Sequence, residues 1–317
     1  MSLVSAFTSA ILPILAIMGL GYVITMTLDI TLESLNDVAL YAFLPALVFH
    51  NLATTSLGGA VLVKVVIGVV FFVGAMWMVS EGVGRIAGVT EPFRSADVLA
   101  AMFPNAGFYG VPLAAFAFGE VGRTTAILWM TVQAFLMYTA GVYVASRGGG
   151  ETGWGAVRSV FRLPLIYAIF LALFARWADV VPPDTAVAMQ TIQMVGEASI
   201  PLMLVVVGAQ LADMEHTSFT SVVSPSALRL FVAPTVAIAV VLALAFDNPT
   251  IARTFVVLSA TPVAVVPLAL AITYSDDPER DGKVASEHLT ATIFVTTLAS
   301  VPVLTVLITV MQSGIVF

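Results

Sequence analysis

The chain has 317 residues, of which 60% are hydrophobic and only 10% are charged, and its formal net charge is −7. So apolar a composition excludes a soluble domain with a polar surface, and the acidic balance excludes the basic patch that a nucleic-acid partner requires. Because the chain has no cysteine, disulfides and thiolate metal sites are also excluded. The composition predicts a polytopic protein of the lipid bilayer, for which we expect no cofactor.

Apolar runs divide the chain into ten predicted helices, since one crossing of a bilayer takes about 20 residues. In chain order we expect them at 4–26, 38–55, 60–83, 96–118, 123–146, 162–180, 186–211, 224–246, 251–274 and 284–311. The connecting segments are short and leave no room for a soluble domain. The predicted fold class is an all-α polytopic membrane protein with ten transmembrane helices.

The distribution of Lys and Arg predicts the orientation of these helices. Eight of these residues follow the odd-numbered helices and three lie on the opposite face: Arg85, Arg94, Arg147, Arg158, Arg162, Arg229, Arg280 and Lys283 against Arg123, Arg176 and Arg253. Since cytoplasmic loops carry the excess of positive charge, we expect both termini on the outer face of a plasma membrane, such as the bacterial inner membrane.

A Gly-rich stretch after Arg147 separates two sets of five helices. We expect a first repeat at 1–146, a cytoplasmic linker at 147–161 and a second repeat at 162–317. An odd number of crossings inverts the second repeat relative to the first. Corresponding helices share features that favour this repeat, such as Pro45 in the second helix and Pro201 in the seventh.

The fourth and ninth helices are each interrupted by proline. The fourth carries Phe-Pro-Asn-Ala-Gly-Phe-Tyr-Gly-Val-Pro-Leu-Ala at 103–114 and the ninth carries Thr-Pro-Val-Ala-Val-Val-Pro-Leu-Ala at 261–269. Backbone groups freed by such breaks need protein, water or ligand partners within hydrocarbon. Paired breaks in corresponding helices predict a midplane substrate site in a secondary transporter, with four prolines at the crossover: Pro104, Pro112, Pro262 and Pro267.

The ends of broken helices present free N–H groups and positive dipole ends, which suit a carboxylate. Asn105 is the first candidate ligand because its amide can donate to a carboxylate without burying a permanent charge, although it could instead satisfy the backbone near Pro104. Tyr109 could contact substrate or pack as an aromatic, and Gln133 could contact substrate or bond one helix to another. The candidate substrate site is completed by Gly107, Gly110, Thr261 and Val263.

Three ionisable residues within the spans are candidates for coupling transport to charge or protons. Lys64 could offset substrate charge or extend toward the outer interface, and Glu197 could carry a proton or bond locally near Pro201. His50 could titrate near neutral pH or serve as a packing residue. We expect no metal site and no enzymatic activity, since the three histidines fall at different depths and no hydrolytic or nucleotide-binding motif is present.

The chain resembles the auxin efflux carrier family, which includes plant PIN-type auxin exporters and bacterial organic-acid carriers. The resemblance spans nearly the whole chain and is strongest at Pro104-Asn105, Gly110-Val111-Pro112-Leu113, Pro262, Val266-Pro267 and Tyr274. It implies two inverted five-helix repeats, a scaffold of helices 1, 2, 6 and 7, a transport domain of helices 3–5 and 8–10, and binding where helices 4 and 9 cross. It also implies a possible homodimer. In plant relatives, the lysine that corresponds to Lys64 has an acidic partner one helical turn earlier. This chain has Ala60 at that position.

Residues and resemblance together predict a secondary transporter of small organic anions, such as malonate, malate or auxin-like aromatic acids, working by elevator-type alternating access. One alternative is a cation-coupled symporter of the bile-acid and sodium type, which needs a midplane carboxylate where helix nine offers only Thr261. The other is a membrane sensor of organic acids, which needs a soluble output domain or a bound partner.

Overall fold

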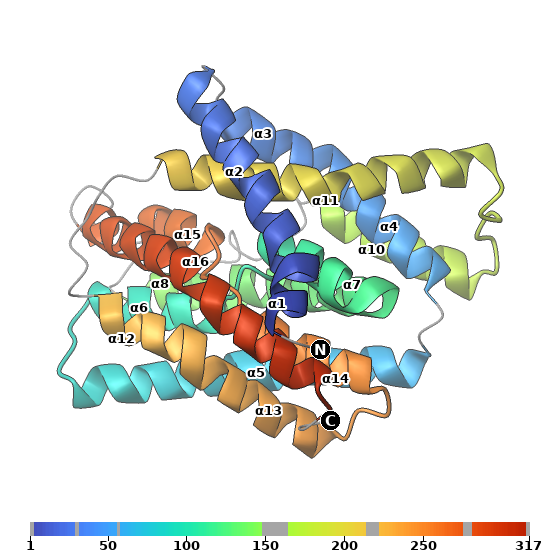
Figure 1. Cartoon of the computed structure of the whole chain (residues 1–317). Helices are drawn as coiled ribbons and strands as arrows, with labels where there is room; N and C mark the ends of the chain where they lie inside the picture. Colours follow the sequence, from blue (N-terminus) through green and yellow to red (C-terminus); the bar gives the residue numbers. More distant parts are fainter. Residues whose placement is uncertain are drawn as a thin grey trace.

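A computed structural model describes residues 3–28, 32–55, 58–147, 164–213, 222–274 and 281–314, and these are almost entirely helical (Figure 1). The described residues contain no β-strand beyond one isolated bridge between two residues. The helical elements are α1 (Leu3–Ala6), η1 (Phe7–Ile11), α2 (Leu12–Thr27), α3 (Leu32–Val38), η2 (Ala39–Phe43), α4 (Leu44–Thr54), α5 (Gly59–Ile86), α6 (Phe93–Met102), η3 (Ala106–Gly110), α7 (Val111–Leu136), η4 (Met137–Gly141), α8 (Val142–Ala145), α10 (Pro164–Trp177), α11 (Val187–Asp213), α12 (Val223–Ala227), η6 (Leu228–Val232), α13 (Ala233–Leu244), α14 (Pro249–Ser259), α15 (Val266–Tyr274) and α16 (Lys283–Gln312).

Seven helices in the described residues are long and apolar enough to cross a membrane. They are Leu3–Thr27, Ser34–Thr54, Gly59–Ile86, Ala106–Ala145, Val187–Ala212, Val223–Leu244 and Lys283–Gln312. The helix Pro164–Trp177 is apolar but shorter. The predicted all-α membrane class is confirmed, whereas the ten-helix inverted repeat stays a prediction. Its linker at 147–161 lies, apart from Arg147, outside the described residues.

Short π-helical segments precede prolines in four of these helices. The segments η1, η2, η3 and η6 each end two residues before a proline, at Pro13, Pro45, Pro112 and Pro234. Proline has no N–H and its ring clashes with the carbonyl group four residues earlier. One turn with i→i−5 bonding moves that carbonyl group aside, so the helix continues through the proline instead of ending.

The segment Ala106–Ala145 is a hairpin of two helices rather than one straight span. Gly119, with φ of 63°, interrupts α7, and a Cβ placed on Gly122 would lie only 2.6 Å from the carbonyl oxygen of Ala114. Eight residues of straight helix would separate these positions by about 12 Å. A Cβ on Gly107 would likewise meet Sδ of Met130 at 2.9 Å. The second half of α7 therefore runs back along the first, so that residues near 133 return to the break near 104.

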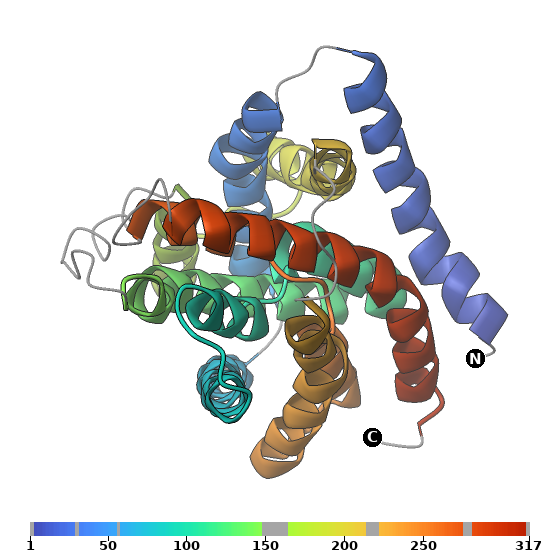
Figure 2. The same cartoon turned by 90° about the vertical axis from the view of Figure 1, so that its left-hand side faces the viewer.

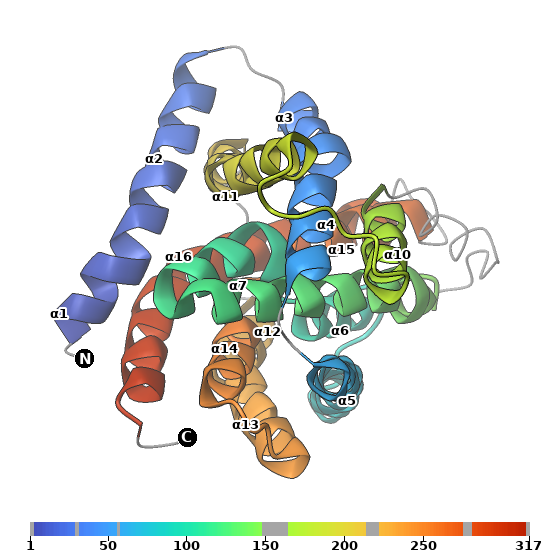
Figure 3. The same ribbon diagram turned by 90° about the vertical axis from the view of Figure 1, so that its right-hand side faces the viewer.

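The helices form two groups that meet at η3 and α7. Contacts join α2, α4, α10 and α11 in one group and α5, α6, α13, α14, α15 and α16 in the other. Figures 1 and 3 show α3, α4 and α11 on one side, α5 and α13 on the other and α7 between them. Figure 2 shows α16 crossing the middle of the molecule. Within the first group, α2 and α11 touch through backbone, since Gly21 faces Val205 and Gly208 faces Met18 with no space for side chains.

Candidate functional site

The two helix interruptions cross in the interior and satisfy each other's backbone. Pro104 and Val263 form an antiparallel bridge. The N–H of Asn105 donates to the carbonyl oxygen of Pro262 over 2.7 Å, and the N–H of Ala264 donates to that of Phe103 over 3.0 Å. Backbone groups that the prolines remove from the helices are thus paired without water. These bonds fix the relative position of the α6–η3 break and the α14–α15 break.

A buried arginine caps the C-terminal ends of α6 and α14, the two helices that precede the breaks. Arg229 of η6 is fully buried, and its Nη1 donates to the carbonyl oxygen of Ala101 over 2.7 Å, while its Nη2 donates to that of Ser259. These carbonyls lie in the last turns of α6 and α14, where helices have unpaired acceptors and the negative end of the dipole. The guanidinium also lies 5.6 Å from the ring centroid of Phe72. Within the described residues Arg229 makes no ion pair, so its positive charge is balanced only by dipoles and the ring.

The hairpin of α7 supports the crossing through an amide. Nε2 of Gln133 donates to the carbonyl oxygen of Pro104 over 2.8 Å, and Oε1 of Gln133 accepts from the indole N–H of Trp129 over 2.9 Å. On the opposite side, the hydroxyl of Thr296 accepts from the N–H of Val263 over 3.2 Å. The crossing is therefore held by side chains from two further helices.

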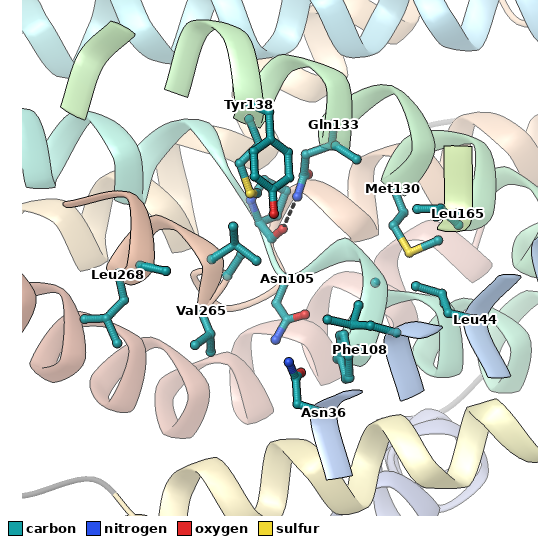
Figure 4. A pocket seen from close by; sticks show the side chains of 18 of the residues that line it. Asn36, Leu44, Asn105, Phe108, Met130, Gln133, Tyr138, Leu165, Val265 and Leu268 are labelled. Carbon is teal, nitrogen blue, oxygen red and sulfur yellow. Dashed lines mark hydrogen bonds between the residues drawn. The ribbon is translucent and has the colours of Figure 1, made fainter. Parts of the chain in front are cut away.

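A cavity of about 570 Å³ lies beside this crossing, between the two groups of helices (Figure 4). Its polar side chains are four amides and one phenol: Asn36, Asn105, Gln133, Gln210 and Tyr138. The remaining wall is apolar and includes Leu40, Leu44, Phe108, Met130, Met137, Leu165, Val265, Leu268 and Ile272. No charged side chain lines the cavity in the described part of the chain. In Figure 4 the amides of Asn36 and Asn105 face each other across it.

Two helices begin at the wall of this cavity. The helix η3–α7 begins at Ala106, and α15 begins at Val266. Gly107 and Phe108 of the first turn of η3 line the cavity on one side, and Val266 at the start of α15 and Val265 directly before it line the cavity on the other. The first N–H groups of a helix have no intrahelical partner and carry the positive end of its dipole. The described wall of the cavity therefore has no formal charge and includes two helix N-termini, although the N–H groups of Ala106 and Tyr109 already bond to the carbonyl oxygen of Pro104 and to Oδ1 of Asn105.

The predicted site residues divide into a cavity wall and the structure behind it. Pro104, Asn105, Gly107 and Gln133 line the cavity. The buried residues Tyr109, Gly110, Thr261 and Val263 do not line it, and neither do Pro112, Pro262 and Pro267. Asn105 lines the cavity, where its role as a ligand stays a prediction, and its Oδ1 accepts from the N–H of Tyr109 over 3.4 Å, so that it also satisfies backbone beside Pro104.

The three predicted coupling residues lie away from the cavity. Lys64 donates to the Asp247 carboxylate over 3.0 Å and to the carbonyl oxygen of Ala245 over 2.9 Å. This hydrogen bond from Lys64 lowers the pKa of the exposed Asp247 carboxyl. Glu197 is exposed and accepts from the amide of Gln193 over 2.8 Å, and His50 is half-buried on α4. None of the three lines the cavity wall.

Sequence reasoning missed one buried ionisable pair. Nε2 of His288, on α16, lies 2.7 Å from Oδ1 of Asp97, on α6, and both side chains are buried. The available signal was an aspartate inside the predicted fourth helix, which membrane insertion penalises unless it finds a partner. Asn36 and Gln210 were also missed, because their elements approach the crossing only in three dimensions. Among the described residues no three His, Asp or Glu side chains are grouped as a metal site.

Comparison with known proteins identifies relatives along almost the whole chain. The family model described as "Membrane transport protein" matches residues 6–153 and 155–308. An uncharacterized transporter of Methanothermobacter thermautotrophicus is 27% identical over 279 residues, which cover 84% of this chain and 88% of the relative. An uncharacterized transporter of Methanocaldococcus jannaschii is 23% identical over 212 residues, which cover 64% of this chain and 68% of the relative.

Proposed function

This chain belongs to the membrane transport protein family, of the auxin efflux carrier type, and we propose that it is a secondary transporter of small organic anions. The observation that carries the proposal is the neutral cavity at the helix crossing, where two helix N-termini and the amides of Asn105 and Gln133 meet. Its volume of about 570 Å³ falls in the range of small-molecule sites. The membership in a transporter family favours carriage over catalysis.

The electrostatics of the crossing favour an anion over a cation. Each helix N-terminus contributes about 0.3 to 2 kcal/mol toward a negative charge, and an amide N–H adds a directional donor. Arg229 bonds the turns directly behind both breaks and has no carboxylate partner among the described residues. A carboxylate in the cavity would be attracted by this buried charge without contacting it.

The apolar wall favours a substrate with one carboxylate and a hydrocarbon or aromatic body. Leu44, Phe108, Met130 and Val265 supply contact surface rather than hydrogen bonds. A second carboxylate would have to be met by Asn36, Gln210 or Tyr138, which carry no formal charge. Auxin-like aromatic acids and short monocarboxylates thus fit this cavity better than malate or malonate, which belong to the same proposed class.

The proposed mechanism is elevator-type alternating access. The cavity lies between the group α2, α4, α10 and α11 and the group that contains the crossing. Movement of the second group along the first would carry a bound anion across the membrane, and the bonds within the crossing would keep the site intact meanwhile. In this proposal the first group is the scaffold and the second is the transport domain.

The test is charge movement in proteoliposomes on a solid support, with a panel of monocarboxylic, dicarboxylic and aromatic acids. Saturable currents for particular acids, lost in Asn105→Ala and retained in Asn51→Ala, support the proposal. Asn51 is a matched control because it is buried, does not line the cavity and, within the described part of the chain, has a side chain that bonds only its own helix, at the carbonyl oxygen of Leu47. Absence of both current and anion binding across the whole panel would refute it.

A sodium-coupled symporter of the bile-acid type is less well supported, because no described cavity residue has a carboxylate that could hold the cation. The same recordings distinguish it, since replacing sodium by choline would abolish its currents and leave those of a sodium-independent anion carrier unchanged.

A further inference from the structure

Three arginines surround one glutamate at the end of α5, far from the helix crossing. Glu81 accepts from Nε of Arg85 over 2.9 Å and from Nη1 of Arg147, and Nε of Arg94 lies 3.7 Å away. A second acid, Glu91, pairs with Arg94 over 3.0 Å. The cluster therefore holds three guanidinium groups and two carboxylates. Since Arg94 is paired with Glu91, one unit of positive charge remains on Arg85 and Arg147, which share the single carboxylate of Glu81.

This excess charge lies in a groove on the surface of α5. A cavity of about 610 Å³ is lined by Gly74, Trp77, Met78, Glu81, Gly82, Arg85 and Arg147. The space over the helix exists because the two glycines have no side chains, and a Cβ added to either would meet no atom within 4 Å. The groove is therefore open along α5 from the arginines to Gly74.

Aromatic rings mark the level at which this groove meets the membrane surface. The guanidinium of Arg147 lies 5.2 Å from the ring centroid of Trp77 and 5.8 Å from that of Tyr143. Trp and Tyr gather at the boundary between hydrocarbon and water, and long basic side chains extend to the same level. The residue types at this end of α5 are therefore those expected at headgroup depth.

From this level the groove descends along an exposed apolar surface. Met78 is 72% exposed, and Phe71 and Val70 are 63% and 46% exposed further along α5. The eleven residue steps from Gly74 to Arg85 span about 17 Å of helix. That length is close to the depth of one leaflet, because the whole hydrocarbon core is about 30 Å thick.

We propose that this groove binds one anionic diacyl phospholipid. Its phosphate would lie between Arg85 and Arg147, whose forked guanidinium groups suit phosphate oxygens, and its acyl chain would follow Gly74 and Met78. Glu81 holds the arginines in place through two of their N–H groups, and their other guanidinium N–H groups form no further hydrogen bond within the described residues. Basic pockets between transmembrane helices recognise anionic headgroups in this way. The proposal does not depend on the transported substrate.

A lipid fits the groove better than a soluble phosphate compound, since half of the groove is apolar and gives a soluble anion nothing to bind. A zwitterionic lipid would fill the same groove but would bring a choline cation close to Arg85. The arrangement therefore combines an acyl-chain site with selection for headgroup charge.

The experiment is native mass spectrometry of the purified full-length protein in neutral detergent, titrated with phosphatidylglycerol or phosphatidylcholine of identical chains. We expect about five-fold tighter binding of phosphatidylglycerol, because the cluster has a net charge of +1 and one basic charge near the surface favours an anionic lipid by about five-fold. Arg85→Gln removes this net charge and should abolish the preference. Gly82→Leu should weaken both lipids by filling the groove without changing any charge, whereas Gly19→Leu, also at an open helix surface, should change neither.

Equal binding of the two lipids by the unaltered protein, or unchanged binding in Gly82→Leu, would overturn the proposal. In the last part of the experiment, glycerol phosphate or inorganic phosphate is added as a competitor to the protein with bound phosphatidylglycerol. Neither should displace phosphatidylglycerol at millimolar concentration, and displacement by either one would assign the arginines to a soluble phosphate instead. Because no carboxylic acid is used, failure here leaves the transport proposal unaffected.

Discussion

The side-chain amide of Gln133 donates to the carbonyl oxygen of Pro104, 29 residues earlier, over 2.8 Å. This bond ties the returning half of the α7 hairpin to the helix break. Oε1 of the same amide accepts from Trp129, so that both ends of the buried Gln133 side chain are paired. Gln133 also lines the cavity. It therefore contributes to stability whether or not it contacts substrate.

Gln133→Leu should destabilise the protein, because it leaves the Trp129 indole N–H without a partner and leaves the Pro104 carbonyl oxygen with only the N–H of Ala106. The unpaired N–H costs about 1 to 3 kcal/mol and the lost bond to Pro104 about 0.5 to 1.5 kcal/mol. Since 1 kcal/mol corresponds to about 2 to 4 °C for a larger domain, we expect thermal unfolding in detergent to fall by at least about 3 °C. Gln193→Leu is the control, because Gln193 pairs with the exposed Glu197 and should change the midpoint by less than about 2 °C. Equal shifts in both variants would contradict this reading.

Asn105→Ala should weaken binding of the transported anion by about 10- to 100-fold, since a hydrogen bond to a charged group contributes about 1.5 to 3 kcal/mol. Asn105→Asp should weaken it further, because a carboxylate would then face the substrate. Calorimetry with whichever acid gives saturable currents measures both. An Asn105→Asp variant that binds as tightly as the unaltered protein would remove Asn105 from the anion site.

Arg229→Met should lower stability, because the carbonyl oxygens of Ala101 and Ser259 lose a charged donor. Two such bonds contribute about 3 to 6 kcal/mol before the cost of burying the guanidinium is subtracted. Arg229→Lys separates charge from geometry, since it keeps the positive charge but cannot form the fork that reaches both helix ends. We expect Arg229→Lys to retain more anion affinity than Arg229→Met at a similar unfolding temperature. Equal affinity in the two variants would exclude an electrostatic role.

Asp97 and His288 should be energetically coupled, as their buried side chains lie 2.7 Å apart. Replacing either one by Ala leaves a buried polar partner, so each single variant should lose about 1 to 3 kcal/mol of stability. The double variant Asp97→Ala, His288→Ala should lose less than the sum of the two. Thermal unfolding of the four proteins gives the coupling energy, and strict additivity would mean that the contact does not stabilise the fold.

Lys64→Gln should leave anion affinity unchanged within about two-fold, since Lys64 pairs with Asp247 and does not line the cavity. The same calorimetric titration checks this. The Lys64 bond lowers the pKa of Asp247, so its contribution to stability is present above the ordinary aspartate pKa and is lost only in acid below it. Lys64→Gln should therefore have no effect on the pH dependence of stability near neutrality. A loss of affinity would instead support the prediction that Lys64 offsets the charge of the substrate.

The sequence alone located the two helix breaks, because prolines and glycines in apolar runs leave few other conformations. It also selected Asn105 and Gln133, since uncharged amides at membrane depth need partners. Which side of the broken helix faces the cavity could not be predicted, because the break changes the helical phase and turns Tyr109 inward while Phe108 lines the wall. The inverted repeat and the direction of the termini stay predictions.

Long-range partners were beyond the reach of sequence patterns for a different reason. Asp247 follows Lys64 by 183 residues and Ala101 precedes Arg229 by 128, and nothing local indicates either pairing. The signal from Arg229 was ambiguous, since an arginine at the start of a predicted helix resembles one that extends to the membrane surface. Its complete burial became evident only when α6, α14 and η6 were placed together.

The glycine contacts between α2 and α11 fix the register of these two helices. Gly208 lies against the backbone of Met18, and sliding α11 by one turn would bring Leu204 or Ala212 to that point, where no Cβ fits. Helices packed through side chains can slip past one another by exchanging rotamers, but two backbones in contact have no such freedom. The α2–α11 pair is therefore expected to move as one rigid unit. In the proposed transport cycle, the other helices would slide along the outer surface of this pair.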